Sequence, residues 1–125
     1  MSAGPDLQLR DPSDLDALLE RAARETVVLF KHSTACPISA HAYGELVRFV
    51  RARANGAPLV ALVRVIEERA VSRAIEQRLG VRHESPQAIV LRGGVPAATL
   101  SHGEITADAL REASGGATPS SGTGR

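Results

Sequence analysis

The 125-residue sequence contains no tryptophan, one tyrosine, two phenylalanines and a single cysteine. One cysteine cannot close a disulfide within the chain, which is typical of a protein from a reducing compartment. With so few aromatic residues, the core must be filled by Val, Leu, Ile and Ala. Hydrophobic residues make up 43% of the chain, which is enough to build the core of one small domain.

The sequence also lacks a strong charge imbalance, a signal peptide and a long apolar run. Its 15 basic and 14 acidic residues give a net charge of +1, so we expect neither nucleic acid nor an anionic membrane as a partner. The first residues, MSAGPDLQLRDPSD, have no basic start and no apolar stretch of signal-peptide length. No run approaches the roughly 18 apolar residues of a membrane-spanning helix. These features predict a soluble, cytoplasmic protein.

Four segments have the apolar spacing of helices. The first, residues 11–25, has Asp11 or Ser13 as its cap and Pro12 near its start. The second starts at Pro37 and stops at Asn55-Gly56, with an apolar stripe predicted over Ile38, Ala42, Leu46, Phe49 and Val50. The third covers residues 67–79, and the fourth begins near Thr106, where Ile105 and Leu110 are placed to form a hydrophobic staple.

Four β-branched or apolar runs alternate with these helices at residues 26–31, 58–66, 87–92 and 95–100. Gly93-Gly94 joins the last two runs as a β-hairpin. Strands alternating with helices predict parallel pairing, and the hairpin adds antiparallel strands. We therefore expect an α/β thioredoxin-like fold, with a small four-stranded mixed sheet flanked by helices on both faces. The domain should span residues 12–113, after an N-terminal extension (1–11) and before a disordered Gly/Ser/Thr-rich tail (114–125).

The cysteine lies in FKHSTACPISA, between the first strand and the second helix. Unpaired N–H groups and the helix dipole at this position favour a thiolate over a thiol. Ser33, Thr34 and Ser39 add hydroxyls that could donate to the sulfur. The alternative is that Cys36 is simply a small buried apolar residue, as free cysteines often are. The polar neighbours and the position before a helix favour a reactive thiol.

A second notable segment is Glu84-Ser85-Pro86-Gln87, directly before an apolar strand. Proline at this position forfeits a ladder hydrogen bond, so it belongs at the first residue of a strand or at an edge. Pro86 could be an ordinary trans residue. A cis bond would instead expose the backbone N–H and C=O of Ser85 beside the sulfur, where an extended substrate could pair with them.

Three stretches, FKHSTACPIS, RVIEERAVSRAIEQRLGVRHESPQ and SHGEIT, together resemble the monothiol bacilliredoxins. These are bacterial thioredoxin-like proteins of the bacillithiol system, with a TCPIS-type motif as their hallmark. The resemblance covers about residues 12–113. Two positions depart from the family pattern. Gly103 follows Ser-His where an aromatic residue is common, and Ala70 stands where R-P-x-S has proline.

The resemblance implies a thioredoxin fold, a nucleophilic Cys36 and a cis proline at Pro86. It implies thiol–disulfide exchange that removes bacillithiol from mixed disulfides on client proteins, with bacillithiol as co-substrate and no bound cofactor. Ser39 stands where a dithiol oxidoreductase has its second cysteine, so a second bacillithiol or a disulfide reductase must regenerate Cys36. The residues expected to contact substrate are Thr34, Pro37, Ser39, Ser85 and Pro86.

Other functions fit the sequence less well. The main alternative is a non-catalytic thioredoxin-like binding module, or a redox sensor whose Cys36 is merely capped by a small thiol. A thiol peroxidase would need a Pro-x-x-x-Thr-x-x-Cys frame, which is absent here. The four histidines have no metal-ligand spacing, and we expect no metal site.

Overall fold

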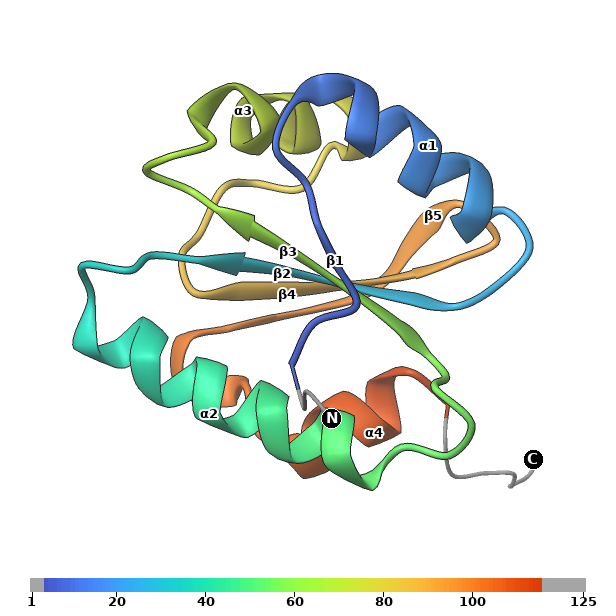
Figure 1. Cartoon of the computed structure of the whole chain (residues 1–125), viewed down its shortest axis with the longest axis vertical. Helices are drawn as coiled ribbons and strands as arrows, with labels where there is room; N and C mark the ends of the chain where they lie inside the picture. Colours follow the sequence, from blue (N-terminus) through green and yellow to red (C-terminus); the bar gives the residue numbers. More distant parts are fainter. Residues whose placement is uncertain (1–3, 116–125) are drawn as a thin grey trace.

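The computed structural model describes residues 4–115, which form a mixed sheet between two layers of helices (Figure 1). Each predicted helix and strand is present, with shorter bounds in most cases. The elements are β1 (Leu7–Gln8), α1 (Pro12–Ala22), β2 (Val27–His32), α2 (Pro37–Ala52), β3 (Leu59–Arg64), α3 (Arg69–Leu79), β4 (Gln87–Arg92), β5 (Val95–Ser101), the 3-10 helix η1 (His102–Glu104) and α4 (Ala107–Ala113).

The strand order across the sheet is β1-β3-β2-β4-β5. Strands β1, β3 and β2 are parallel, whereas β4 and β5 are antiparallel to their neighbours. This topology confirms the thioredoxin-like α/β class. The sheet has five strands rather than the expected four, because β1 lies within residues predicted to be an extension. Beyond residue 115, the predicted disordered tail lies outside the described residues.

Strand β1 is held in the sheet by Asp6, the residue before it. The Asp6 carboxylate accepts hydrogen bonds from both terminal nitrogens of Arg53, at 2.6 and 2.7 Å, and from the Val60 N–H at 2.8 Å. The Arg53 guanidinium holds the pKa of Asp6 below its usual range, although burial opposes this shift. These partners are about 50 residues away in sequence, so local pattern gives no sign of this strand.

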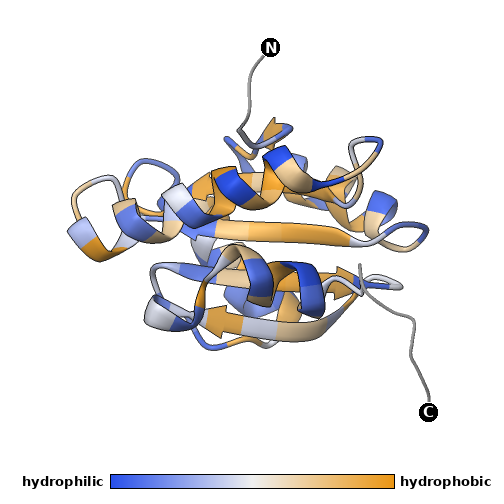
Figure 2. Ribbon diagram, turned by 90° about the horizontal axis from the view of Figure 1, so that it is seen from below, coloured by the Kyte–Doolittle hydropathy of each residue, from blue (hydrophilic) through white to orange (hydrophobic). Residues whose placement is uncertain are grey.

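The alternation of side chains along β2 divides the core into two clusters. Val27 and Leu29 face α1 and α3, whereas Val28 and Phe30 face α2 and α4. All four residues are fully buried. Figure 2, seen from the side of α2 and α4, shows mainly apolar strands together with helices that carry both polar and apolar residues. Because both faces of β2 are covered, its sequence is a continuous apolar run rather than an alternating one.

Two helix starts follow their predicted signals, with one correction. Thr106 caps α4 through a hydrogen bond from the Ala109 N–H, and Ile105 and Leu110 are both buried, as the predicted staple requires. At the start of α2, however, Ile38 is 56% exposed and Ser39 is fully buried, so the predicted stripe is wrong at its first position. Residues 39, 42, 46, 49 and 50 share one helical face, and residue 38 lies beside it.

Candidate active site

Cys36 is the N-cap residue of α2, and its side chain is partly exposed. The chain leaves β2 at His32 and makes a turn in which the Cys36 N–H donates to the Ser33 carbonyl at 3.3 Å. Pro37 then takes the first helical position, where its missing N–H is no loss. The sequence therefore places the only thiol at the open end of a helix, as expected from the cysteine-proline pair.

Two backbone donors lie unused beside this thiol. The N–H groups of Ile38 and Ser39, in the first turn of α2, have no hydrogen-bond partner among residues 4–115. The first N–H groups of a helix are normally satisfied by the side chain of the N-cap residue. Here that side chain is Cys36, so a thiolate or an incoming sulfur has ready donors at this position.

Ser39 supports the loop from inside the protein. Its fully buried Oγ lies 2.9 Å from the Ser33 N–H, which donates to it, and 2.8 Å from His32 Nδ1. Burial lowers the pKa of His32, although the Glu67 carboxylate opposes the shift, so the imidazole is neutral at pH 7 and Nδ1 can accept the serine proton. The His32 ring stacks on Tyr43 with centroids 5.0 Å apart. Ser39 therefore fixes the loop before Cys36, and it offers no surface to a substrate.

The Ser85–Pro86 bond is cis, as the family resemblance implies. Lys31 pairs with Gln87 across β2 and β4, which brings Pro86 to the end of the sheet where β2 leads into the cysteine loop. The Pro86 carbonyl accepts from the His102 N–H at 3.1 Å. Neither the N–H nor the C=O of Ser85 has a partner among the described residues, which leaves a short free backbone edge.

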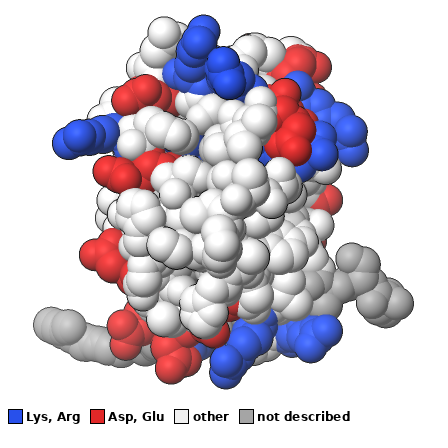
Figure 3. All heavy atoms as spheres, turned by 90° about the vertical axis from the view of Figure 1, so that its left-hand side faces the viewer, with Lys and Arg blue, Asp and Glu red and all other residues white. Residues whose placement is uncertain are grey.

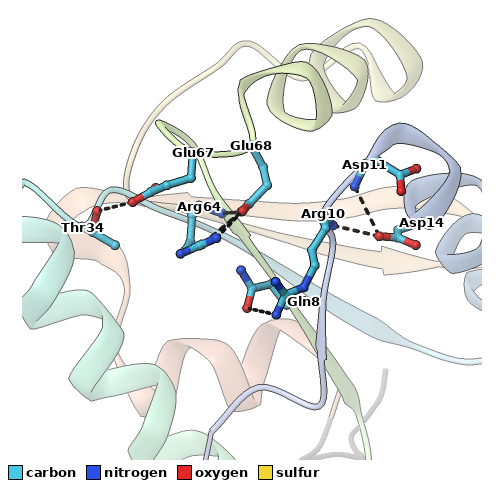
Figure 4. Close-up of polar contacts among 8 residues, drawn as sticks. All are labelled: Gln8, Arg10, Asp11, Asp14, Thr34, Arg64, Glu67 and Glu68. Atoms are coloured by element: carbon cyan, nitrogen blue, oxygen red, sulfur yellow. Dashed lines mark hydrogen bonds and ion pairs between the residues drawn. The ribbon is translucent and has the colours of Figure 1, made fainter.

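The rim around Cys36 is mainly uncharged. Thr34, Pro37 and Ile38 are all exposed here. Figure 3, which faces the end where β2 and β3 terminate, shows a largely uncharged middle with acidic and basic side chains around it. Thr34 Oγ1 donates to Glu67 at 3.1 Å and ties the cysteine loop to the turn before α3 (Figure 4). Sequence reasoning missed this bond, because its partners are 33 residues apart.

Lys31 is a buried charge close to this end of the sheet. Its side chain has no exposed surface, and its Nζ has no hydrogen-bond partner among the described residues. It alternates with Val27 and Leu29, so it extends toward α3. Burial lowers the pKa of Lys31 to about 8, although Glu76 and Glu84 oppose the shift.

We predict that Lys31→Met stabilises the protein at pH 7. In the wild type, protonated Lys31 is solvated in the unfolded chain and buried without a partner in the folded one. From a folded-state pKa of about 8 and an ordinary value of 10.5, the charge costs about 3 kcal/mol below pH 8.

That cost falls as pH rises from 8 to 10.5, because only the unfolded chain still binds this proton there. Urea unfolding at several pH values should therefore give the variant the larger free energy of unfolding at pH 7. Near pH 10.5 the two proteins should have similar free energies of unfolding. A stability difference that does not change with pH would contradict this prediction.

Other parts of the described structure contain few features that would suggest a second functional site. No group of three or more His, Cys, Asp or Glu side chains within residues 4–115 could hold a metal ion. None of the helices in this range is long and apolar enough to cross a membrane. The largest cavity described, about 330 Å³, lies between the C-terminal end of α2 and α4 and contains none of the predicted site residues.

Comparisons with known proteins agree with the fold and with the family resemblance. A sequence model of the family described as monothiol bacilliredoxin BrxC matches residues 7–110. A solved structure with a thioredoxin fold, described as a candidate oxidoreductase, is 31% identical with a TM-score of 0.76, over 86% of this chain and 91% of that one. A mutant thioredoxin from Halobacterium salinarum is 20% identical with a TM-score of 0.69, over 97% and 99% of the two chains. A thioredoxin from Nicotiana alata is 12% identical with a TM-score of 0.68, over 90% and 92%.

Proposed function

The chain belongs to the monothiol bacilliredoxin family, and we propose that it removes bacillithiol from mixed disulfides on client proteins through Cys36. One observation carries this proposal. The chain's only thiol is partly exposed at the N-terminus of α2, beside two backbone N–H groups without partners. Such a position favours the thiolate, which is the nucleophile in thiol–disulfide exchange.

The reaction consists of two exchanges. The Cys36 thiolate attacks the bacillithiol sulfur of the client disulfide, a new sulfur–sulfur bond forms, and the client thiolate leaves with the electron pair of the broken bond. The thiolate of a second bacillithiol then attacks the bacillithiol sulfur bound to Cys36. This step releases Cys36 as a thiolate and yields bacillithiol disulfide, which a separate disulfide reductase would reduce. We place this cycle in the cytoplasm, where small thiols remain reduced.

The neighbouring residues would serve this chemistry in different ways. Thr34 and Pro37 are exposed beside the sulfur and are suited to contact the substrate. The free N–H and C=O of Ser85 could pair with the backbone of a client, as an added strand pairs with a sheet edge. Ser39 would act indirectly, by holding the loop that carries Cys36.

A redox sensor is the second candidate, because a lone thiol that becomes capped has no partner cysteine in the chain to uncap it. Two incubations, one with a bacillithiolated client and one with bacillithiol disulfide, separate the two functions when the masses of the intact proteins are then measured. We expect the client to lose the mass of bacillithiol and this protein to gain it. If Cys36 is capped by bacillithiol disulfide while the modified client stays unchanged, the protein is a sensor and not an exchange enzyme.

A further inference from the structure

A cavity of about 240 Å³ lies against the first half of α3 and is lined by Val65, Arg69, Ser72, Arg73, Glu76 and His83. Hereafter it is called the α3 cavity. Arg69 and Arg73 lie one turn apart on the same face of the helix. Between them, Ser72 is buried, and its Oγ lies 3.4 Å from His83 Nδ1. The cavity thus combines two guanidinium groups with a hydroxyl and an imidazole.

The two arginines of the α3 cavity have no ionic or hydrogen-bond partner among residues 4–115. Arginines that line other cavities are paired: Arg53 binds Asp6, and Arg111 binds Asp108. Like charges at i and i+4 on a helix repel each other. An anion between Arg69 and Arg73 would remove this repulsion, and a guanidinium group matches the geometry of a carboxylate.

Lys31 adds a positive charge near the α3 cavity, although it is not among the lining residues. It is fully buried, and its ammonium group has no hydrogen-bond partner among the described residues. Burial lowers the pKa of His83, and the positive charge of Lys31 lowers it further, so this charge acts on one residue of the lining. Glu76 is the only acid in the lining, and its carboxylate already accepts a hydrogen bond from the His83 N–H at 3.1 Å.

The α3 cavity and Cys36 lie at the same end of the molecule. Figure 1 shows that α3 begins where β2 and β3 end, close to the loop that leads into α2. Val65, in the cavity wall, donates its N–H to the His32 carbonyl at 2.9 Å. In addition, the bond between Thr34 and Glu67 joins the cysteine loop to the turn before Arg69.

From these observations we infer that the α3 cavity binds the carboxylates of the low-molecular-weight thiol that Cys36 exchanges, through Arg69 and Arg73. This inference rests on the proposed exchange function and makes it more specific. The site would select thiols that carry carboxylates, such as bacillithiol, over neutral thiols of similar reactivity. Arg69 and Arg73 would bind the part of the substrate that does not react, so their loss should weaken substrate binding more than it slows the exchange step.

The test compares one anionic and one neutral substrate, bacillithiol disulfide and hydroxyethyl disulfide, with the full chain. For the double variant Arg69→Gln/Arg73→Gln, we expect the second-order rate constant for formation of the mixed disulfide between Cys36 and bacillithiol to fall about tenfold with bacillithiol disulfide. The rate with hydroxyethyl disulfide should not change. Added salt should slow only the reaction of the wild type with bacillithiol disulfide.

Two further variants separate charge from structure. Arg69→Lys/Arg73→Lys keeps both charges and should recover part of the lost rate. Arg78→Gln removes an arginine from the same helix outside the cavity, where it pairs with exposed Asp16, and should behave as the wild type. Equal losses of rate with both disulfides, or no loss of rate with bacillithiol disulfide, would overturn this inference but not the proposed function. If the wild type reacts with neither disulfide, the proposed function fails as well.

Discussion

Replacement of Cys36 by serine is expected to abolish thiol transfer while leaving the fold intact. A serine hydroxyl stays protonated at neutral pH and cannot form the mixed disulfide, so no other residue of this chain can take over the reaction. The helix should not suffer, because serine is a preferred N-cap residue and can accept from the free N–H groups at the start of α2. Intact-mass analysis should therefore show an unmodified variant and a client that remains fully bacillithiolated.

The control is the thermal unfolding of both proteins. We expect the melting temperature of Cys36→Ser to equal or exceed that of the wild type, since a helix cap contributes about 0.5–2 kcal/mol. Thr34→Ala is a matched variant from the same turn, which removes a hydroxyl bound to Glu67 and leaves the thiol in place. It should still transfer bacillithiol to Cys36, although more slowly if Thr34 contacts the substrate. Release of free client by Cys36→Ser would show that the thiol is not the reacting group.

Local signals in the sequence were sufficient to predict most elements. Pro37 marks the start of α2, Thr106 caps α4, and Gly93-Gly94 joins β4 to β5. Strand β1 could not be predicted in this way, because two residues have no periodicity and their place in the sheet depends on the contact of Asp6 with Arg53. The order of strands likewise depends on contacts between residues that are distant in the sequence.

The site was predictable where it depends on position along the chain. Cys36 lies at the start of a helix, as its place before Pro37 predicted. The cis Ser85–Pro86 bond was implied by the family resemblance, because the local sequence fits an ordinary trans proline as well. The sequence was a poorer guide to the surroundings of the Ser39 side chain. The residue type suggested a donor to the sulfur, whereas its spacing with Ala42 and Leu46 already placed it on the buried face of α2. Here periodicity was the better guide, because burial decides what a hydroxyl can reach.

The position of Ser39 leads to a second large effect, expected for Ser39→Cys. This change puts a thiol three residues after Cys36, within the first turn of α2. The introduced thiolate can attack Cys36 Sγ in the mixed disulfide, form an internal disulfide and release the small thiol. After reaction with a limiting amount of bacillithiol disulfide, the wild type should carry one bacillithiol on Cys36. The variant should carry none, and its mass should be lower than that of the reduced variant by two hydrogen atoms.

Ser39→Ala is the matched control, because it loses the same hydrogen bonds without gaining a thiol. The Ser33 N–H and His32 Nδ1 lose their partner in both variants, so each should be less stable than the wild type by about 1–3 kcal/mol. Only Ser39→Cys should discharge the adduct, whereas Ser39→Ala should retain it as the wild type does. If the adduct persisted in Ser39→Cys, a thiol at residue 39 would be unable to attack Cys36 Sγ. The need for an outside thiol to release the adduct would then result from the geometry of the loop, and not only from the lack of a second cysteine.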